Sequence, residues 1–456
     1  MRLIGRATSS PRRRPTVVVT AGIVTTVALA LAGCGGQPAS HATGGKSYAG
    51  QTLTYWATIQ GTGPAETKKV LTAEFAKFTQ ETGAKVNVEV IPWTTLQTQV
   101  LNAVTSNTGA DVMEIGNTQA PSLAASGGFL EFTPAVFNQI GGESKFVKTS
   151  LAETGLEGKT PISVPVYAGV YALAYNKADF AAAGISSPPT SWSDLMADGR
   201  KLTGNGRYGL AIDGSDPTDA AHWAFMLGQQ AGNPLYTNSG KPDFATMKMA
   251  KALQNYIDLF ASDGIVNPAN AQKGHQPLSE FANNKAAMMI GQGIATSLTQ
   301  LGMKSSDFGI SGFPVMSPLP EGGKAIESHI AGINLAVRAS TSHMAASLAL
   351  VKFLTSTNEQ ATINQTYGSL PVVTAAYKLP AFQDSTTKAY LDILASHAAA
   401  MPKVPSEAQM EPLLGGAITT LIGQTASSGK TPTDQQILSA LQNAQNQLIT
   451  STGGSN

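Results

Sequence analysis

The stretch 165–195, which reads PVYAGVYALAYNKADFAAAGISSPPTSWSDL, decides the fold that this sequence predicts. Its apolar run 166–175 is rich in Val and Tyr, which is typical of a buried strand. Residues 178–183 predict a short helix that ends at Gly184, and a Pro-Pro pair separates it from a second helix. A buried strand that leads into helices indicates an α/β protein.

Strands and helices also alternate upstream of this stretch. The predicted strands 53–56, 86–90 and 111–115 are separated by helices that begin at Pro64 and Trp93. This alternation favours a parallel sheet that helices cover on both faces, with ligands bound at the carboxyl ends of the strands. The loop residues expected at that edge are Ile59 and Gln60 after the first strand, and Asn117, Thr118 and Gln119 after the third.

The N-terminal segment has the features of an export signal. Residues 1–34 hold five arginines followed by an apolar run, 17–32, that is short for a membrane-spanning helix. The run ends in Leu-Ala-Gly-Cys, which predicts a lipoprotein signal with Cys34 as the acylated residue. Residues 35–50 are mostly small and polar, which predicts a flexible tether. The sequence thus predicts an extracytoplasmic protein that a lipid on Cys34 anchors to a bacterial cell membrane.

Length and composition narrow the protein class. With 456 residues, the chain is longer than one ordinary domain and suits two lobes. Its formal net charge is +1, and the leader holds five of the basic residues, so nothing favours a nucleic acid partner. Cys34 is the only cysteine, so we expect no internal disulfide bond.

Motifs of enzymes and cofactor sites are weak in this chain. The GxGxxG at 204–209 follows a predicted helix and precedes a predicted strand, which is the reverse of a dinucleotide site. The SxxK at 385–388 lacks the partner motifs of acylating enzymes. The six histidines are scattered without metal-ligand spacing. We therefore expect no catalytic residue, no cofactor and no metal.

Several segments, taken in order, resemble one family. The sequence Tyr175-Asn176-Lys177, then Gly184, then Ser191-Trp192 resembles the maltose-binding-protein family of extracellular solute receptors of ABC transporters. Segments 281–293 and 353–371 are also similar to that family. The resemblance implies a two-lobed periplasmic-binding-protein fold, in which each lobe is a mainly parallel sheet flanked by helices and the ligand cleft lies between the lobes.

The resemblance also implies how the chain is divided. Each lobe consists of discontinuous segments, with crossovers near residues 165, 325 and 371. The first lobe would contain 51–164 and 326–370, and the second would contain 165–325 and the C-terminal helical part 371–456.

Site residues follow from matching positions in the family. A charged, sugar-gripping pair falls on Thr118 and Gln119, which are neutral here but can still bind hydroxyl groups. A sugar-stacking aromatic falls on His222 or Trp223, and packing of Trp223 in the core is an equal alternative. Two other stacking platforms are absent, which leaves Gln292 and Glu411 as hydroxyl contacts. The further candidates are Tyr167, Asp216, Gly332, Asn334 and Tyr367.

The resemblance therefore implies a receptor. It would capture a carbohydrate, a di- or oligosaccharide, by hinge closure and pass it to the permease of an ABC importer. We expect a monomer that touches the membrane only through its lipid. One alternative is a secreted lipoprotein hydrolase of glycans. Another is a receptor for a different solute, such as a polyamine or ferric ion.

Overall fold

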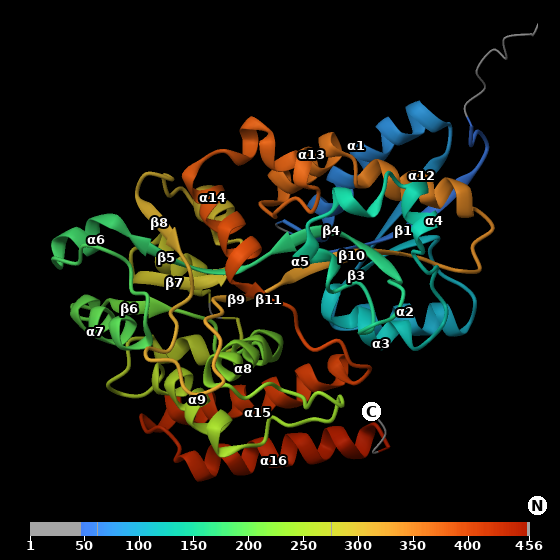
Figure 1. Cartoon of the computed structure of the whole chain (residues 1–456). Coiled ribbons are helices and arrows are strands. Elements are labelled where there is room, and N and C mark those ends of the chain that lie inside the picture. Colours follow the sequence, from blue (N-terminus) through green and yellow to red (C-terminus); the bar gives the residue numbers. More distant parts are fainter. Residues whose placement is uncertain (1–46, 62, 275, 454–456) are drawn as a thin grey trace, which may run out of the picture. The chain divides into compact units, whose positions relative to one another are not determined.

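The computed structural model describes residues 47–61, 63–274 and 276–453, which belong to one compact unit. The predicted leader 1–34 with Cys34, and most of the predicted tether 35–50, lie outside the described residues. Within the described residues, no helix combines the length and the apolar character that crossing a membrane requires. Most of the described chain folds around two separate β-sheets (Figure 1).

The first sheet has five strands, of which the three N-terminal ones match the predicted parallel strands. The fourth position is taken by a strand that runs antiparallel to both of its neighbours, so the sheet is mixed. In spatial order the strands are β2 (Lys85–Ile91), β1 (Thr52–Thr58), β3 (Val112–Gly116), β10 (Ala331–Val337) and β4 (Ser163–Gly169).

The helices beside this sheet begin where the sequence predicts. Helix α1 (Pro64–Thr82) has Pro64 in its first turn, and Gly83 ends it with φ of 83°, a conformation that glycine adopts without strain. Helix α2 starts at Trp93 (Trp93–Thr105). The other helices around this sheet are α3 (Ala120–Ala124), α4 (Pro134–Gln139), α5 (Lys148–Leu151), α12 (Met344–Leu354) and α13 (Thr357–Tyr367).

The second sheet has four strands and is also mixed: β6 and β7 pair in parallel, and β5 is antiparallel to β7 and β8. In spatial order they are β6 (Tyr208–Ala211), β7 (Ala286–Gln292), β5 (Tyr171–Asn176) and β8 (Phe308–Ser311). The later helices and those around this sheet are α6 (Lys177–Ala182), α7 (Trp192–Leu202), α8 (Pro217–Ala231), α9 (Met247–Asp258), α10 (Pro277–Ala282), α11 (Ile294–Gln300), α14 (Ser385–Asp392), α15 (Glu407–Ser428) and α16 (Asp434–Ser451).

The apolar run 166–175 is two strands, whereas its composition predicts one. Strand β4 belongs to the first sheet and β5 to the second, and they meet at the buried residue Val170. Val166 packs into the core of the first sheet, while Leu173 packs into the core of the second. The run is continuously apolar because it crosses directly from one core to the other.

Two further segments of the chain run between the sheets. The short strands β9 (Ser328–His329) and β11 (Ala398–Ala399) pair in parallel, and this pair lies between the two larger sheets in Figure 1. After residue 371 the chain first contributes Val372 and Tyr390, among others, to the core of the first sheet, and then Met401 and later residues to the core of the second. The exact lobe boundaries stay a prediction.

Candidate functional site

A cavity of about 640 Å³ lies between elements of the two sheets, at the edge where β1 and β3 end. Its volume is within the usual range for small-molecule sites. The structure brings most of the predicted site residues to its wall. They are Ile59, Gln60, Asn117, Thr118, Gln119, Tyr167, Asp216, His222, Gln292, Gly332, Tyr367 and Glu411.

Two predicted site residues do not line this cavity. Trp223 is 1% exposed, and its ring packs 4.9 Å from Tyr171 and 5.0 Å from Phe313 in the core of the second sheet. Successive residues of a helix point about 100° apart, so α8 turns His222 toward the cavity and Trp223 away from it. Asn334 is also 1% exposed, and its Nδ2 donates to the backbone oxygen of Glu153 at 2.6 Å. Its amide therefore holds backbone in place.

The loop after β1 is held by one buried carboxylate. Glu114 on β3 accepts hydrogen bonds from the Thr58 backbone N and Oγ1, both at 2.7 Å, and from the Tyr55 hydroxyl at 2.6 Å. Thr58 Oγ1 in turn accepts from Gln60 Nε2 at 3.0 Å, and the Tyr167 hydroxyl donates to Glu114 at 3.4 Å. Burial raises the pKa of Glu114, and the hydrogen bonds to its carboxylate oppose that rise. Glu114 thus positions two cavity-lining side chains without lining the cavity.

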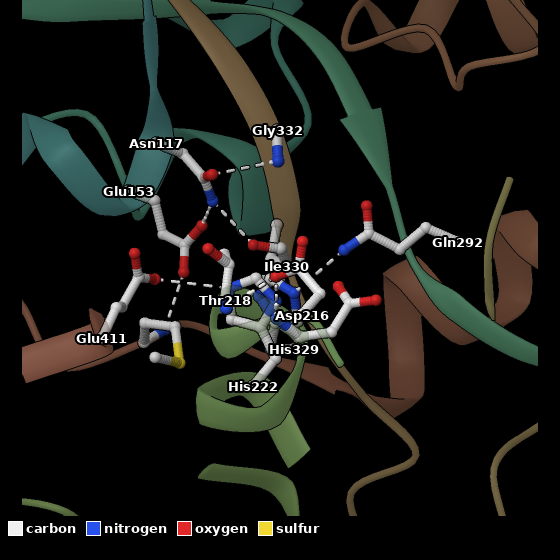
Figure 2. A network of polar contacts seen from close by, with 12 residues as sticks. Asn117, Glu153, Asp216, Thr218, His222, Gln292, His329, Ile330, Gly332 and Glu411 are labelled. Atoms are coloured by element: carbon white, nitrogen blue, oxygen red, sulfur yellow. Dashed lines mark hydrogen bonds and ion pairs between the residues drawn. The ribbon is translucent and has the colours of Figure 1, made fainter. Parts of the chain in front are cut away.

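Asn117 has all of its side-chain polar atoms engaged within the protein (Figure 2). Its Nδ2 donates to the Glu153 carboxylate and, at 2.6 Å, to the backbone oxygen of Ile330, while its Oδ1 accepts from Gly332 N at 3.0 Å. Glu153 also accepts from the Met401 backbone N at 2.7 Å, and burial raises its pKa well above the ordinary value. These bonds join the end of β3 to the segments that run between the sheets. They make Asn117 a positioning residue.

Two stacked imidazole rings form the floor of the cavity. The rings of His222 and His329 lie 3.8 Å apart between centroids, and Nε2 of His329 is 3.3 Å from Gln292 Nε2 (Figure 2). Burial, followed by the neighbouring His222, lowers the pKa of His329 well below its ordinary value. His329 is therefore neutral near pH 7.

The side chains of His222 and Glu411 contact each other at the cavity wall. The Tyr171 hydroxyl donates to Asp219 Oδ1 and also lies 3.0 Å from His222 Nδ1. The other ring nitrogen, Nε2, is 3.3 Å from Glu411 Oε1. Because a bare nitrogen and a carboxylate would both be acceptors, this contact requires a proton on one of them. Helices α8 and α15 thus share a hydrogen-bonded pair at the cavity wall.

Asp219 makes the stability of the protein depend on pH. Burial raises the pKa of Asp219 to about 6, although His222 and the Tyr171 hydroxyl favour its charged form. Between about pH 4 and pH 6 the folded protein binds more protons at this carboxyl than the unfolded chain does. Its contribution to the free energy of unfolding therefore falls as the pH rises through this range, and stays low above it.

We expect Asp219→Asn to stabilise the protein at pH 8 by about 2 to 3 kcal/mol and to change little at pH 4. Asparagine is nearly isosteric and carries no charge to bury. Urea unfolding at both pH values measures the difference, and Asp263→Asn on an exposed turn is the matched control. A gain of the same size at both pH values would contradict the assignment to this carboxyl.

The sequence did not mark several of the residues that line the cavity, among them Trp93, Asp219 and His329. Trp93 follows Pro92 at the end of β2, an edge where ligands are expected, but its sequence context marks only the start of a helix. Asp219 has a local explanation in the sequence as an acidic residue in the first turn of α8, so nothing marked it as a cavity residue. His329 lies in β9, where no pattern distinguishes it from a core residue. Among the described residues, no group of three or more His, Cys, Asp or Glu is arranged to hold a metal ion.

The arrangement of a cavity between two mixed sheets agrees with a family match. Residues 61–361 match the family model of the bacterial extracellular solute-binding proteins. The chain belongs to this family. A member from Streptomyces coelicolor, the diacetylchitobiose binding protein DasA, is 27% identical over 328 residues, which are 68% of this chain and 71% of DasA.

Other comparisons within the family are more distant or shorter. A binding protein of Brucella abortus (strain 2308) is 29% identical over 238 residues, so the match spans 50% of this chain and 54% of that relative, about half of its length. An ABC transporter solute-binding protein from Thermotoga lettingae TMO, solved with α-D-tagatose, superposes with a TM-score of 0.72 at 22% identity. That comparison covers 87% of this chain and 100% of the other, and it shows the two-lobed periplasmic-binding-protein fold.

Proposed function

We propose that this protein captures a carbohydrate in the cavity between its two sheets and delivers it to the permease of an ABC importer. The observation that carries the proposal is the cavity wall, where amide and hydroxyl side chains from both sides face one space. The amides of Gln60, Gln119 and Gln292 can both donate and accept, as sugar hydroxyls require. The match to the diacetylchitobiose binding protein DasA supports a sugar as the ligand.

The charges of the wall support a ligand without negative charge. Asp216, Asp219 and Glu411 line the cavity, and no Lys or Arg is found among its described lining residues. An anionic sugar would meet carboxylates without a compensating cation. Uronic acids and sugar phosphates should therefore bind far more weakly than neutral sugars.

Binding would favour a closed arrangement of the two lobes. Thr118 and Gln119 follow a strand of the first sheet, whereas His222 and Gln292 lie on elements of the second. A ligand that touches both groups gains its full set of contacts only when the lobes approach each other. We propose that the permease recognises this closed form.

We also propose an extracytoplasmic location with a lipid on Cys34 as the membrane anchor. The Leu-Ala-Gly-Cys sequence that ends at Cys34 supports this anchor. We further propose that the protein is a monomer that needs no cofactor and catalyses no reaction. A fatty-acid label should enter the wild-type protein and not Cys34→Ala.

A thermal-shift screen of the mature body tests the proposed function. Neutral mono-, di- and oligosaccharides, a uronic acid and a polyamine are compared, and a neutral sugar at about 100 times its Kd should stabilise the fold by about 2.7 kcal/mol. Gln292→Ala should lower the affinity for that sugar about tenfold because a hydroxyl contact is lost. The exposed control Gln300→Ala should leave the affinity unchanged. If the polyamine stabilises the protein and none of the sugars does, the proposal of a sugar ligand is wrong. Conversion of the sugar, seen by mass spectrometry, would instead support a hydrolase.

A further inference from the structure

Trp93 is an exposed aromatic side chain at the cavity. It is the first residue of α2, it is 41% exposed, and it lines the same cavity as His222 and His329. Five large apolar side chains are exposed in the described part of the chain, and of these Trp93 is the one that lines the cavity. The five are Trp93, Met247, Leu301, Leu319 and Ile449.

The indole ring is held in place by the protein itself. Its Nε1 donates to the backbone oxygen of Ile59 at 3.3 Å, which ties the ring to the loop after β1. Pro92 precedes it and caps α2 in an extended conformation. A tryptophan has two side-chain torsions, so this bond leaves the ring little freedom to lose when a ligand arrives.

We infer that Trp93 is the stacking platform for an outer sugar ring, so that the ligand is an extended oligosaccharide and not a single sugar. This rests on the proposed function and adds a subsite to it. The inner ring lies at the floor formed by His222 and His329, where Gln292 from the second sheet can also reach it. The outer ring lies against Trp93 on the first side. The apolar face of the indole matches the C–H face of a pyranose.

The groups around Trp93 are consistent with a ligand site at its exposed face. Its polar edge is satisfied by Ile59, and Thr94 and Gln60 line the wall beside it with groups that can bind ring hydroxyls. An apolar face framed by polar groups is the usual composition of a ligand site. Length selectivity then follows, because only a ligand that extends from the floor can reach this face.

The test is a calorimetric titration with two homologous series, N-acetylglucosamine oligomers and maltose oligomers of one to five units. The proteins compared are wild type, Trp93→Ala, Trp93→Phe and the exposed control Leu301→Ala. We expect wild-type affinity to rise with length in one series. Trp93→Ala should lower the affinity for the longest oligomers about tenfold and change the affinity for the shortest by no more than a factor of two. Trp93→Phe and Leu301→Ala should retain most of the wild-type affinity.

A second readout follows the ring directly. The chain has four tryptophans, each of which has an indole N–H that NMR can detect. The signal that is missing from the NMR spectrum of Trp93→Phe belongs to Trp93. This signal should shift with a long oligomer and not with the monosaccharide.

The outcomes separate the subsite from the function. Equal weakening at every length, no weakening at any length, or a wild-type affinity that does not rise with length would overturn the subsite and leave sugar binding intact. Failure of both series to bind the wild-type protein would overturn the subsite together with the sugar ligand on which it rests.

Discussion

Gly415→Ala should lower the free energy of unfolding by about 3 kcal/mol or more, which is among the largest effects that a single added methyl group can have. A Cβ atom at position 415 would lie 1.7 Å from the backbone oxygen of Pro217 and 2.5 Å from its carbonyl carbon. Because both atoms belong to backbone, the clash is relieved only by moving α15 away from α8. Urea unfolding measures the loss.

The same substitution should weaken ligand binding. Helix α8 carries Asp219 and His222, and α15 carries Glu411 one turn before the substituted glycine. Separation of the helices lengthens the 3.3 Å contact between His222 Nε2 and Glu411 Oε1 and so displaces two side chains of the cavity wall. The sugar found by thermal shift should therefore bind Gly415→Ala at least tenfold more weakly.

The neighbouring glycine is a matched control. Gly416 lies in the same helix, and apart from its chain neighbours and the nearby backbone of its own helix no described atom comes within 4 Å of a Cβ atom built there. Gly416→Ala should therefore stabilise the protein by about 0.5 to 1 kcal/mol, since alanine favours a helix more than glycine does. Similar destabilisation by both substitutions would show that helix packing at 415 is not the cause.

Glu114→Gln should lower the free energy of unfolding by about 2 to 4 kcal/mol and should also weaken sugar binding. The carboxylate accepts from Tyr55, from Tyr167 and twice from Thr58. An amide offers one oxygen, so its NH₂ group must face donors that now lack an acceptor. The loop that carries Gln60 and the Tyr167 ring should shift as a result.

Two measurements check this prediction. Urea unfolding should show the loss for Glu114→Gln, while Glu131→Gln, an exposed control, should stay within about 0.5 kcal/mol of wild type. Calorimetry should show a raised Kd at a temperature where the variant is folded. An unchanged Kd in a destabilised variant would mean that Glu114 supports the fold and does not position the site.

Local sequence patterns predicted the elements that carry the site. Pro64 and the glycine after α1 mark that helix, and the side chains of Ser191 and Asp216 cap α7 and α8. These signals act over three or four residues, where backbone hydrogen bonding and torsion preferences dominate. The rule that ligands bind at the carboxyl ends of strands then found the loops 58–60 and 117–119 without any contact information.

Tertiary packing decided which side chains of those elements reach the cavity. Periodicity does not show which face of α8 meets a core, so the sequence left open whether His222 or Trp223 reaches the cavity. The structure places His222 at the cavity and Trp223 in the core. The amides of Asn117 and Asn334 are engaged by groups far away in the chain, such as Ile330 and Glu153. Burial of these amides requires such partners, and a sequence pattern does not reveal them.

By itself the sequence determined the α/β class, most helix and strand positions and the edge at which a ligand is expected, because each depends on neighbours in the chain. Only the tertiary structure decided that the run 166–175 divides between two cores, that Glu114 organises the loop after β1, and that Trp93 faces the cavity. Each of these depends on contacts between residues tens of positions apart. Such contacts form only when the two sheets and their helices have packed.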